Sequence, residues 1–82
     1  MKVTIKFFTF FGNLSGVDKT ELYLDRGATV KEALEKIACD FPKLKKWLPQ
    51  YGWVFIRGNY ADLRTQLKNE DEISLFPPIA GG

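Results

Sequence analysis

The sequence of 82 residues has no histidine and one cysteine. Without histidine, neither imidazole acid–base catalysis nor His metal ligation is available to it. One cysteine cannot form an internal disulfide, which favours a reducing compartment, so we expect a cytoplasmic protein. Cys39 falls about half a turn from the apolar stripe of its predicted helix, and no neighbouring group would activate its thiol.

Long apolar runs and a charge excess are missing too. No run approaches the ~20 apolar residues that span a bilayer, and Met1 to Lys6 carries charges where a signal peptide is apolar. Twelve Lys+Arg against ten Asp+Glu leave a net charge of +2, which gives little support for nucleic-acid binding. We interpret Lys43, Lys45 and Lys46 as a solvated helix end. Neither a membrane nor a nucleic acid is therefore expected as a partner.

Nucleotide-binding motifs are absent as well: the sequence has neither a P-loop nor a GxGxxG fingerprint, and its internal glycines are scattered singly, as turn residues are. We therefore expect no cofactor to be bound by this chain.

Strand patterns dominate what is present. The opening segment is β-branched and aromatic, with Val3, Ile5 and Phe7 on one face and Phe8 and Phe10 on the other. Its connection to the next strand contains glycines and reads as a hairpin loop or a helical turn. The patterns predict strands at residues 2–11, 19–25, 53–56, 59–62 and 72–76.

A single main helix follows the second strand. Thr29 and Glu32 fit a capping box at its start, an apolar stripe runs from Val30 to Phe41, and Pro42 ends it. One helix covers one side of a sheet, so we predict an α+β fold with a mixed sheet of four to five strands and one open face. The predicted core is Val3, Ile5, Phe7, Leu22, Leu24, Val30, Leu34, Ile37, Phe41, Ile73 and Leu75.

The chain is predicted to divide into a folded domain at 1–76 and a flexible tail at 77–82. The tail reads Pro77, Pro78, Ile79, Ala80, Gly81 and Gly82. Two prolines favour an extended path away from the sheet, and two glycines leave the terminal carboxylate unhindered. Fully extended, six residues reach about 20 Å. Such an arm suits a narrow cleft on a partner protein, whereas a frayed terminus would carry no function.

The segment from Asp71 to Gly82 resembles the C-terminal signature of the small subunit of molybdopterin synthase. The opening strand, the helix start at Thr29 and the total length agree with that family. The resemblance implies a β-grasp, ubiquitin-like fold and a sulfur-carrier function. It implies that a ubiquitin-activating-like enzyme adenylates Gly82 with ATP, and that a sulfur donor converts it to a thiocarboxylate. The large synthase subunit then uses this sulfur to build molybdopterin.

Two short segments depart from the family pattern. The turn before the last strand reads Asn69, Glu70, Asp71, Glu72, and we expect Asn69 to adopt the left-handed conformation there. At the preceding strand end, Arg57 and Gly58 replace the usual Asn-Gly.

The docking surface is predicted from the strand faces. Phe8 and Phe76 project from the uncovered side of the sheet, and Tyr60 matches an apolar interface position of the family. Exposed aromatics are common interface anchors. Alternatively, Phe8 and Phe10 are covered by the chain's own loops around Trp47 and Trp53.

Three other functions stay open at this point. In the first, the chain would be a protein modifier that joins Gly82 to lysines of target proteins. In the second, it would carry sulfur for thiamine synthesis or tRNA thiolation. In the third, it would be a binding module whose tail has no function.

Overall fold

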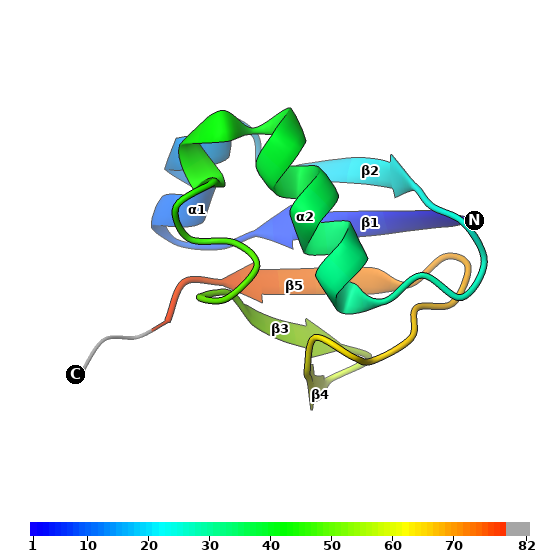
Figure 1. Ribbon diagram of the computed structural model, residues 1–82. Helices are drawn as coiled ribbons and strands as arrows, with labels where there is room; N and C mark the ends of the chain where they lie inside the picture. The colour runs from blue at the N-terminus through cyan, green and yellow to red at the C-terminus, as the bar shows by residue number, and fades with distance from the viewer. Residues whose placement is uncertain (79–82) are drawn as a thin grey trace.

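A computed structural model describes residues 1–78. The elements in chain order are β1 (Lys2–Phe7), α1 (Phe10–Ser15), β2 (Lys19–Tyr23), α2 (Val30–Asp40), the 3-10 helix η1 (Pro42–Leu44), β3 (Trp53–Ile56), β4 (Asn59–Ala61) and β5 (Glu72–Phe76). The strands form one sheet in the order β2-β1-β5-β3-β4, with β1 and β5 parallel at its centre (Figure 1). α2 lies across one face. The predicted β-grasp arrangement is confirmed.

The hydrophobic core fills the space between α2 and the sheet. The central strands meet with Ile5 beside Ile73, and both side chains are fully buried. Of the predicted core residues, Leu24 and Phe41 are only partly buried, and all the others are buried. The predicted list left out several large residues that are buried, namely Phe11, Leu44, Leu48, Val54, Ile56 and Leu67.

The predicted capping box begins α2. The Thr29 hydroxyl accepts from the amide of Glu32 at 3.4 Å, and the Thr29 amide donates to a Glu32 carboxylate oxygen at 3.1 Å. The helix ends at Asp40, directly before Phe41 and Pro42, as the restriction on residues before proline predicts. Within residues 1–78, no helix is long and apolar enough to cross a membrane.

The first predicted strand was too long. β1 ends at Phe7, because Thr9 takes a φ of 54° and Phe10 begins the short helix α1. Phe10 therefore does not share an outer strand face with Phe8. Because the chain turns into α1 here, the Phe11 side chain is completely buried at the end of the core. Two smaller corrections concern β2, which ends at Tyr23 rather than at 25, and β4, which ends at Ala61 rather than at 62.

The turn before β5 also differs from the prediction. The residue with positive φ is Glu70, at 71°, and Asn69 is not left-handed. Asn69 instead uses its side-chain oxygen to accept from the amide of Lys2 at 2.9 Å. Asp71 is buried in this turn, where its carboxylate accepts from the Lys68 amide at 2.7 Å and from the Arg57 guanidinium.

Gly52 sits where the loop before β3 touches the core. A Cβ there would lie 2.8 Å from Leu75 Cδ1 and 2.9 Å from Leu48 Cδ2. Both leucines are buried, so Gly52→Ala is expected to destabilise the fold by about 1–3 kcal/mol through overpacking. Chemical denaturation measures this loss.

Gly12→Ala is the matched control, since its added Cβ would meet nothing nearer than the Phe7 carbonyl oxygen at 3.7 Å. Gly12 lies in α1, where alanine is the better helix former by roughly 0.5–1 kcal/mol. If the Gly52 variant is as stable as the Gly12 variant, a Cβ at position 52 does not collide with Leu48 and Leu75.

Candidate functional site

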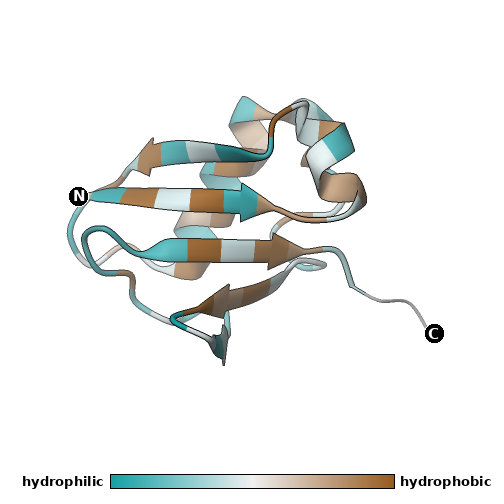
Figure 2. Ribbon diagram, turned by 180° about the vertical axis from the view of Figure 1, so that it is seen from behind, coloured by the Kyte–Doolittle hydropathy of each residue, from teal (hydrophilic) through white to brown (hydrophobic). Residues whose placement is uncertain are grey.

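Four aromatic side chains cluster on the sheet face that α2 leaves uncovered, and we call Phe8, Phe55, Tyr60 and Phe76 the open-face cluster. The Phe8 and Phe76 rings stack with centroids 4.4 Å apart and planes 11° apart. Phe55 meets Phe76 edge-on at 5.6 Å and Tyr60 at 5.8 Å. Figure 2 looks onto this face, with β1, β5 and β3 in front of the helix. The four rings form one continuous apolar surface.

Strand geometry places these rings together. Phe55 of β3 pairs directly with Tyr60 of β4, which sets both side chains on the same face. Phe76 is the last residue of β5. Phe8 lies just beyond β1, and its amide donates to the Leu75 carbonyl at 3.1 Å, which keeps it beside that strand end. Tyr60 is 65% exposed, whereas the three phenylalanines are half-buried.

The structure brings together Phe8 and Phe76, and Tyr60 joins them through Phe55. Phe55 was missed by the sequence interpretation, although its alternation with the buried Val54 and Ile56 was a usable signal. Phe10 lies elsewhere, with its ring centroid 5.2 Å from that of Trp47. The alternative of coverage by Trp47 therefore applies to Phe10 rather than to Phe8.

The C-terminal end of β5 adjoins this cluster. Pro77 is buried and Pro78 is half-buried, so both prolines contact the domain. Ile79, Ala80, Gly81 and Gly82 lie outside the described residues. Their exposure, their role and the tail boundary at Pro77 therefore stay predictions.

The rest of the open face is charged. Lys6 of β1 contacts Glu72 of β5 at 2.8 Å, and its hydrogen bond and charge lower the pKa of the Glu72 carboxyl. Lys2 lies 3.5 Å from Glu21 and 3.7 Å from Glu70. The charge of Glu21, followed by that of Glu70, raises the pKa of the Lys2 ammonium. Ion pairs thus occupy this side of the face, and aromatic rings occupy the other.

The Lys6–Glu72 pair makes a pH-dependent prediction. Folding lowers the pKa of the Glu72 carboxyl. The pair therefore makes its full contribution to folding stability at pH values above the pKa that Glu72 has in the unfolded chain, ordinarily about 4.3. This contribution is lost as the pH falls through the lowered value. Lys6→Gln should move the pKa of Glu72 back toward its ordinary value. The movement should be incomplete because Lys19 also contributes.

An NMR titration of the Glu72 carboxyl carbon measures this change. Lys31→Gln on α2 removes the same charge from an exposed position away from β5 and should leave the titration unchanged. An equal response of Glu72 to both substitutions would contradict the pairing.

The described residues offer binding surface rather than reactive groups. Residues 1–78 contain no group of three or more His, Cys, Asp or Glu side chains placed to hold a metal. Cys39 is exposed on α2, as predicted. The candidate site is thus an aromatic face beside the end of the last strand.

A mixed sheet grasping one helix in this topology is the ubiquitin-like β-grasp fold. The model of the ThiS family matches residues 5–82, and the chain belongs to this family. It is a ubiquitin-like sulfur carrier of the ThiS type, which confirms the general class that the C-terminal motif predicted.

Solved structures agree with this assignment. A putative molybdopterin converting factor, subunit 1, from Pyrococcus furiosus is 31% identical over 96% of this chain and 99% of that chain, with a TM-score of 0.86. The small archaeal modifier protein 1 (SAMP1) from Haloferax volcanii is 27% identical over 100% of both chains, with a TM-score of 0.88.

A third similar structure is a complex of subunits 1 and 2 of molybdopterin-converting factor from Helicobacter pylori. It is 30% identical over 100% of both chains, with a TM-score of 0.67. Proteins of this kind therefore bind partner proteins.

Proposed function

We propose that this chain is the sulfur-carrier subunit of a molybdopterin synthase. Its Gly82 carboxylate is adenylated, converted to a thiocarboxylate and used as the sulfur source for molybdopterin. The observation that carries this proposal is the sequence from Pro77 to Gly82, which follows β5 directly after the stacked Phe8–Phe76 pair. The likeness to the Pyrococcus furiosus subunit supports the molybdopterin pathway.

The chemistry requires activation before sulfur transfer. An ionised carboxylate is a poor electrophile, so a carboxylate oxygen of Gly82 first attacks the α-phosphorus of ATP and pyrophosphate leaves. Hydrosulfide released by the donor then attacks the carbonyl carbon, AMP leaves with the electrons of the broken C–O bond, and loss of the sulfur-bound proton leaves the thiocarboxylate. The sequence has no nucleotide motif and no histidine. Both steps therefore belong to partner proteins, and this chain is a carrier rather than an enzyme.

The two glycines serve this chemistry by their size. A partner must bring its reacting atoms to within about 3–3.5 Å of the terminal carboxylate, and Gly81 and Gly82 present no Cβ to the walls of a narrow cleft. We propose that Ile79 and Ala80 line the same cleft, and that Pro77 and Pro78 set the direction in which the chain enters it.

The open-face cluster is proposed as the surface that holds these partners. Large aromatics on an uncovered sheet face resemble the anchors of protein interfaces, and Phe76 directly precedes the two prolines. The large synthase subunit and the adenylating enzyme are the expected occupants. The Helicobacter pylori complex of subunits 1 and 2 supports such an assembly. We place the protein in the cytoplasm, where its single thiol stays reduced.

A protein modifier is the second candidate, and the likeness to SAMP1 favours it. A modifier uses the same adenylation but transfers the Gly82 carbonyl to a lysine amine, forming an isopeptide bond. Carriers for thiamine synthesis or tRNA thiolation would differ only in the final sulfur acceptor.

Mass spectrometry of the protein isolated from its own cells separates these functions. A carrier yields free protein with a C-terminal thiocarboxylate. A modifier yields high-mass conjugates in which Gly82 is joined to target lysines. A cell lacking this chain should also lose molybdopterin, and loss of thiamine or of thiolated tRNA alone would contradict the proposed pathway.

A further inference from the structure

A second surface with its own chemistry lies near the end of β5. One depression is lined by Leu14, Pro42, Lys43, Lys45 and Lys46, and a neighbouring depression by Lys46, Trp47 and Tyr51. Lys46 lines both, so the two lie side by side. We call the residues Phe10, Lys43, Lys45, Lys46, Trp47 and Tyr51 the basic–aromatic surface.

Its charge is unbalanced. Lys43, Lys45 and Lys46 are all exposed, and none of them forms a salt bridge within the described part of the chain. On the open sheet face, by contrast, Lys2 and Lys6 each lie against glutamates. The prediction of solvated lysines is therefore correct about their exposure, and no acidic side chain within residues 1–78 forms a salt bridge with them.

The aromatic side chains of this surface pack against one another beside the three lysines. The Trp47 ring lies 5.2 Å from Phe10 and 6.1 Å from Phe11, and the Lys46 ammonium lies 5.9 Å from the Trp47 centroid. Phe10 is 40% exposed and Tyr51 57% exposed. The surface therefore combines exposed aromatic area, which is enriched in protein interfaces, with three cations, which can steer an acidic partner toward it.

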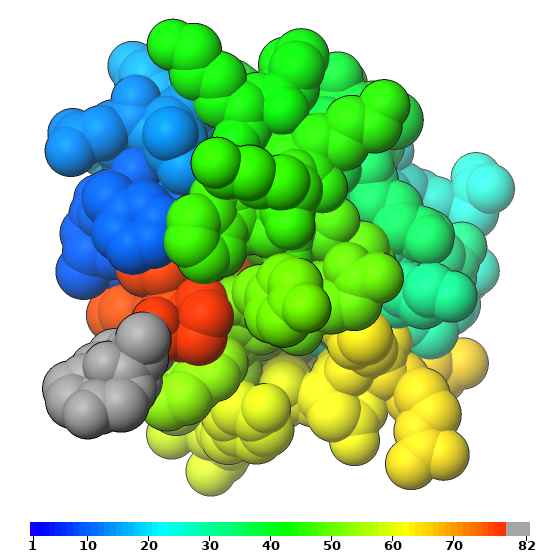
Figure 3. Space-filling model, turned by 60° about the vertical axis from the view of Figure 1, so that its left-hand side comes forward, coloured from blue at the N-terminus to red at the C-terminus, as the bar shows by residue number. Residues whose placement is uncertain are grey.

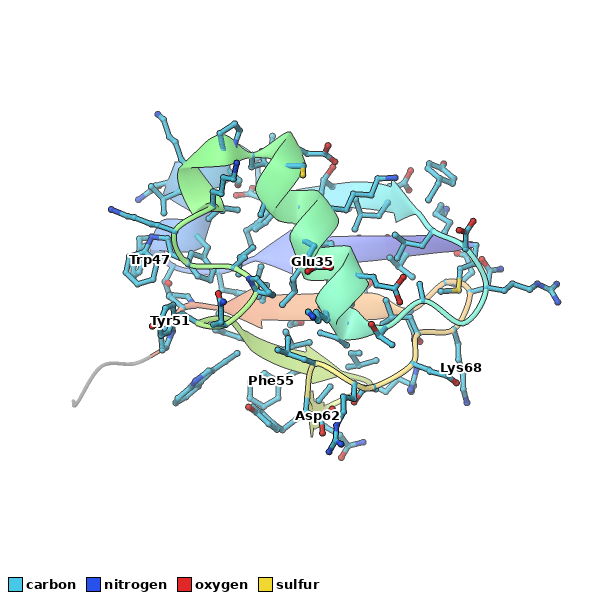
Figure 4. All side chains as sticks on the ribbon, viewed as in Figure 1. Glu35, Trp47, Tyr51, Phe55, Asp62 and Lys68 are labelled. Atoms are coloured by element: carbon cyan, nitrogen blue, oxygen red, sulfur yellow. The ribbon has the colours of Figure 1, made fainter. Side chains whose placement is uncertain are left out.

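The chain path sets this surface beside the end of β5. Trp53, which follows the loop carrying Trp47 and Tyr51, pairs with Phe76. Figure 4 shows Trp47 and Tyr51 at the end of the molecule where the last strand finishes. In Figure 3 the blue segment after β1, the green segment before β3 and the red end of β5 meet on one face. The basic–aromatic surface thus lies on the helix side of this end, and the open-face cluster lies on the other side.

We propose that the basic–aromatic surface docks on an acidic surface of the adenylating partner, beside the cleft that receives the C-terminal residues. This inference rests on the proposed function. A protein that takes in the residues after Pro78 must approach this end of the domain, where the lysines lie. Attraction between opposite charges acts mainly by speeding encounter, so reversing these charges lowers affinity through slower association, and the fast dissociation that remains suits a carrier that leaves one partner for the next.

A nucleic acid fits this surface less well. Bases stack on free aromatic faces, whereas Phe10 and Trp47 pack against each other. The charge of the whole chain is also only +2.

The test compares two double substitutions of equal charge change. Lys45→Glu/Lys46→Glu alters the basic–aromatic surface, and Lys31→Glu/Lys68→Glu alters two exposed lysines outside it. Binding to the cognate adenylating enzyme is measured by calorimetry at low and at high salt, with the ATP-dependent loading rate at saturating carrier. The first variant should bind about tenfold more weakly at low salt, less so at high salt, and load at the normal saturated rate. The second should behave as wild type.

Equal affinity of the two variants would overturn this inference. So would a defect confined to binding of the large synthase subunit, or one confined to binding of single-stranded polyuridine RNA. Failure of the wild-type chain to be loaded is a separate result, because it would refute the proposed function itself.

Discussion

Deleting Gly82 is expected to abolish sulfur loading while leaving the thermal midpoint nearly unchanged. The shortened chain ends about 3.4 Å early, so its carboxylate falls short of the position at which the partner reacts. Loading should fall below detection, because displacement by even 1 Å costs about a hundredfold in rate. Stability should be retained, since the core cluster ends at Leu75 and changes away from a core usually cost less than about 0.5 kcal/mol.

The control for this deletion is Cys39→Ser. Cys39 is the sole thiol and is exposed, which makes it the one side chain that could accept sulfur in place of the C-terminus. The serine variant should be loaded at the wild-type rate. Sulfur loading that survives the deletion of Gly82 but is lost with Cys39→Ser would show that the C-terminus is not the carrier site.

Phe76→Ala is expected to weaken binding to the large subunit or to the adenylating enzyme by ~2 kcal/mol or more, or roughly thirtyfold. The ring stacks on Phe8 and meets Phe55 edge-on, so its loss breaks the open-face cluster at its centre. The stability loss should be below the ~3–5 kcal/mol of a fully buried phenylalanine, because Phe76 is half-buried. Calorimetric titration and denaturant unfolding of one variant give both quantities.

Tyr23→Ala is the matched control for this substitution. Tyr23 ends β2 and is 65% exposed, and it pairs with Lys2 far from the cluster. It should leave partner affinity unchanged. A large stability loss for Phe76→Ala with unchanged affinity would assign Phe76 to the core instead.

The regular parts of the fold were predictable because local and tertiary signals agree there. β3 and β5 have the predicted bounds, since their alternation matches the two faces of the sheet. The start of α2 was predictable because the capping box joins Thr29 to Glu32, only three residues further along the chain. The juxtaposition of Phe8 and Phe76 likewise followed from strand faces alone.

The parts that were missed depend on long-range contacts. Threonine has no preference for positive φ, so nothing in the sequence indicated the conformation of Thr9. An aromatic run such as Phe10–Phe11 favours a strand, and the helix α1 forms here because it buries Phe11. In the turn before β5, the Asn69 side chain is engaged by the distant Lys2 amide. The basic–aromatic surface was invisible for the same reason: it forms where α1 brings Phe10 against Trp47.

The intact mass of the carrier after incubation with its adenylating enzyme, ATP and a sulfur source tests the central claim most directly. The account predicts a mass gain equal to the difference between one sulfur and one oxygen atom, located at Gly82 by fragmentation and dependent on ATP. An unchanged mass, or sulfur located on Cys39, would contradict it.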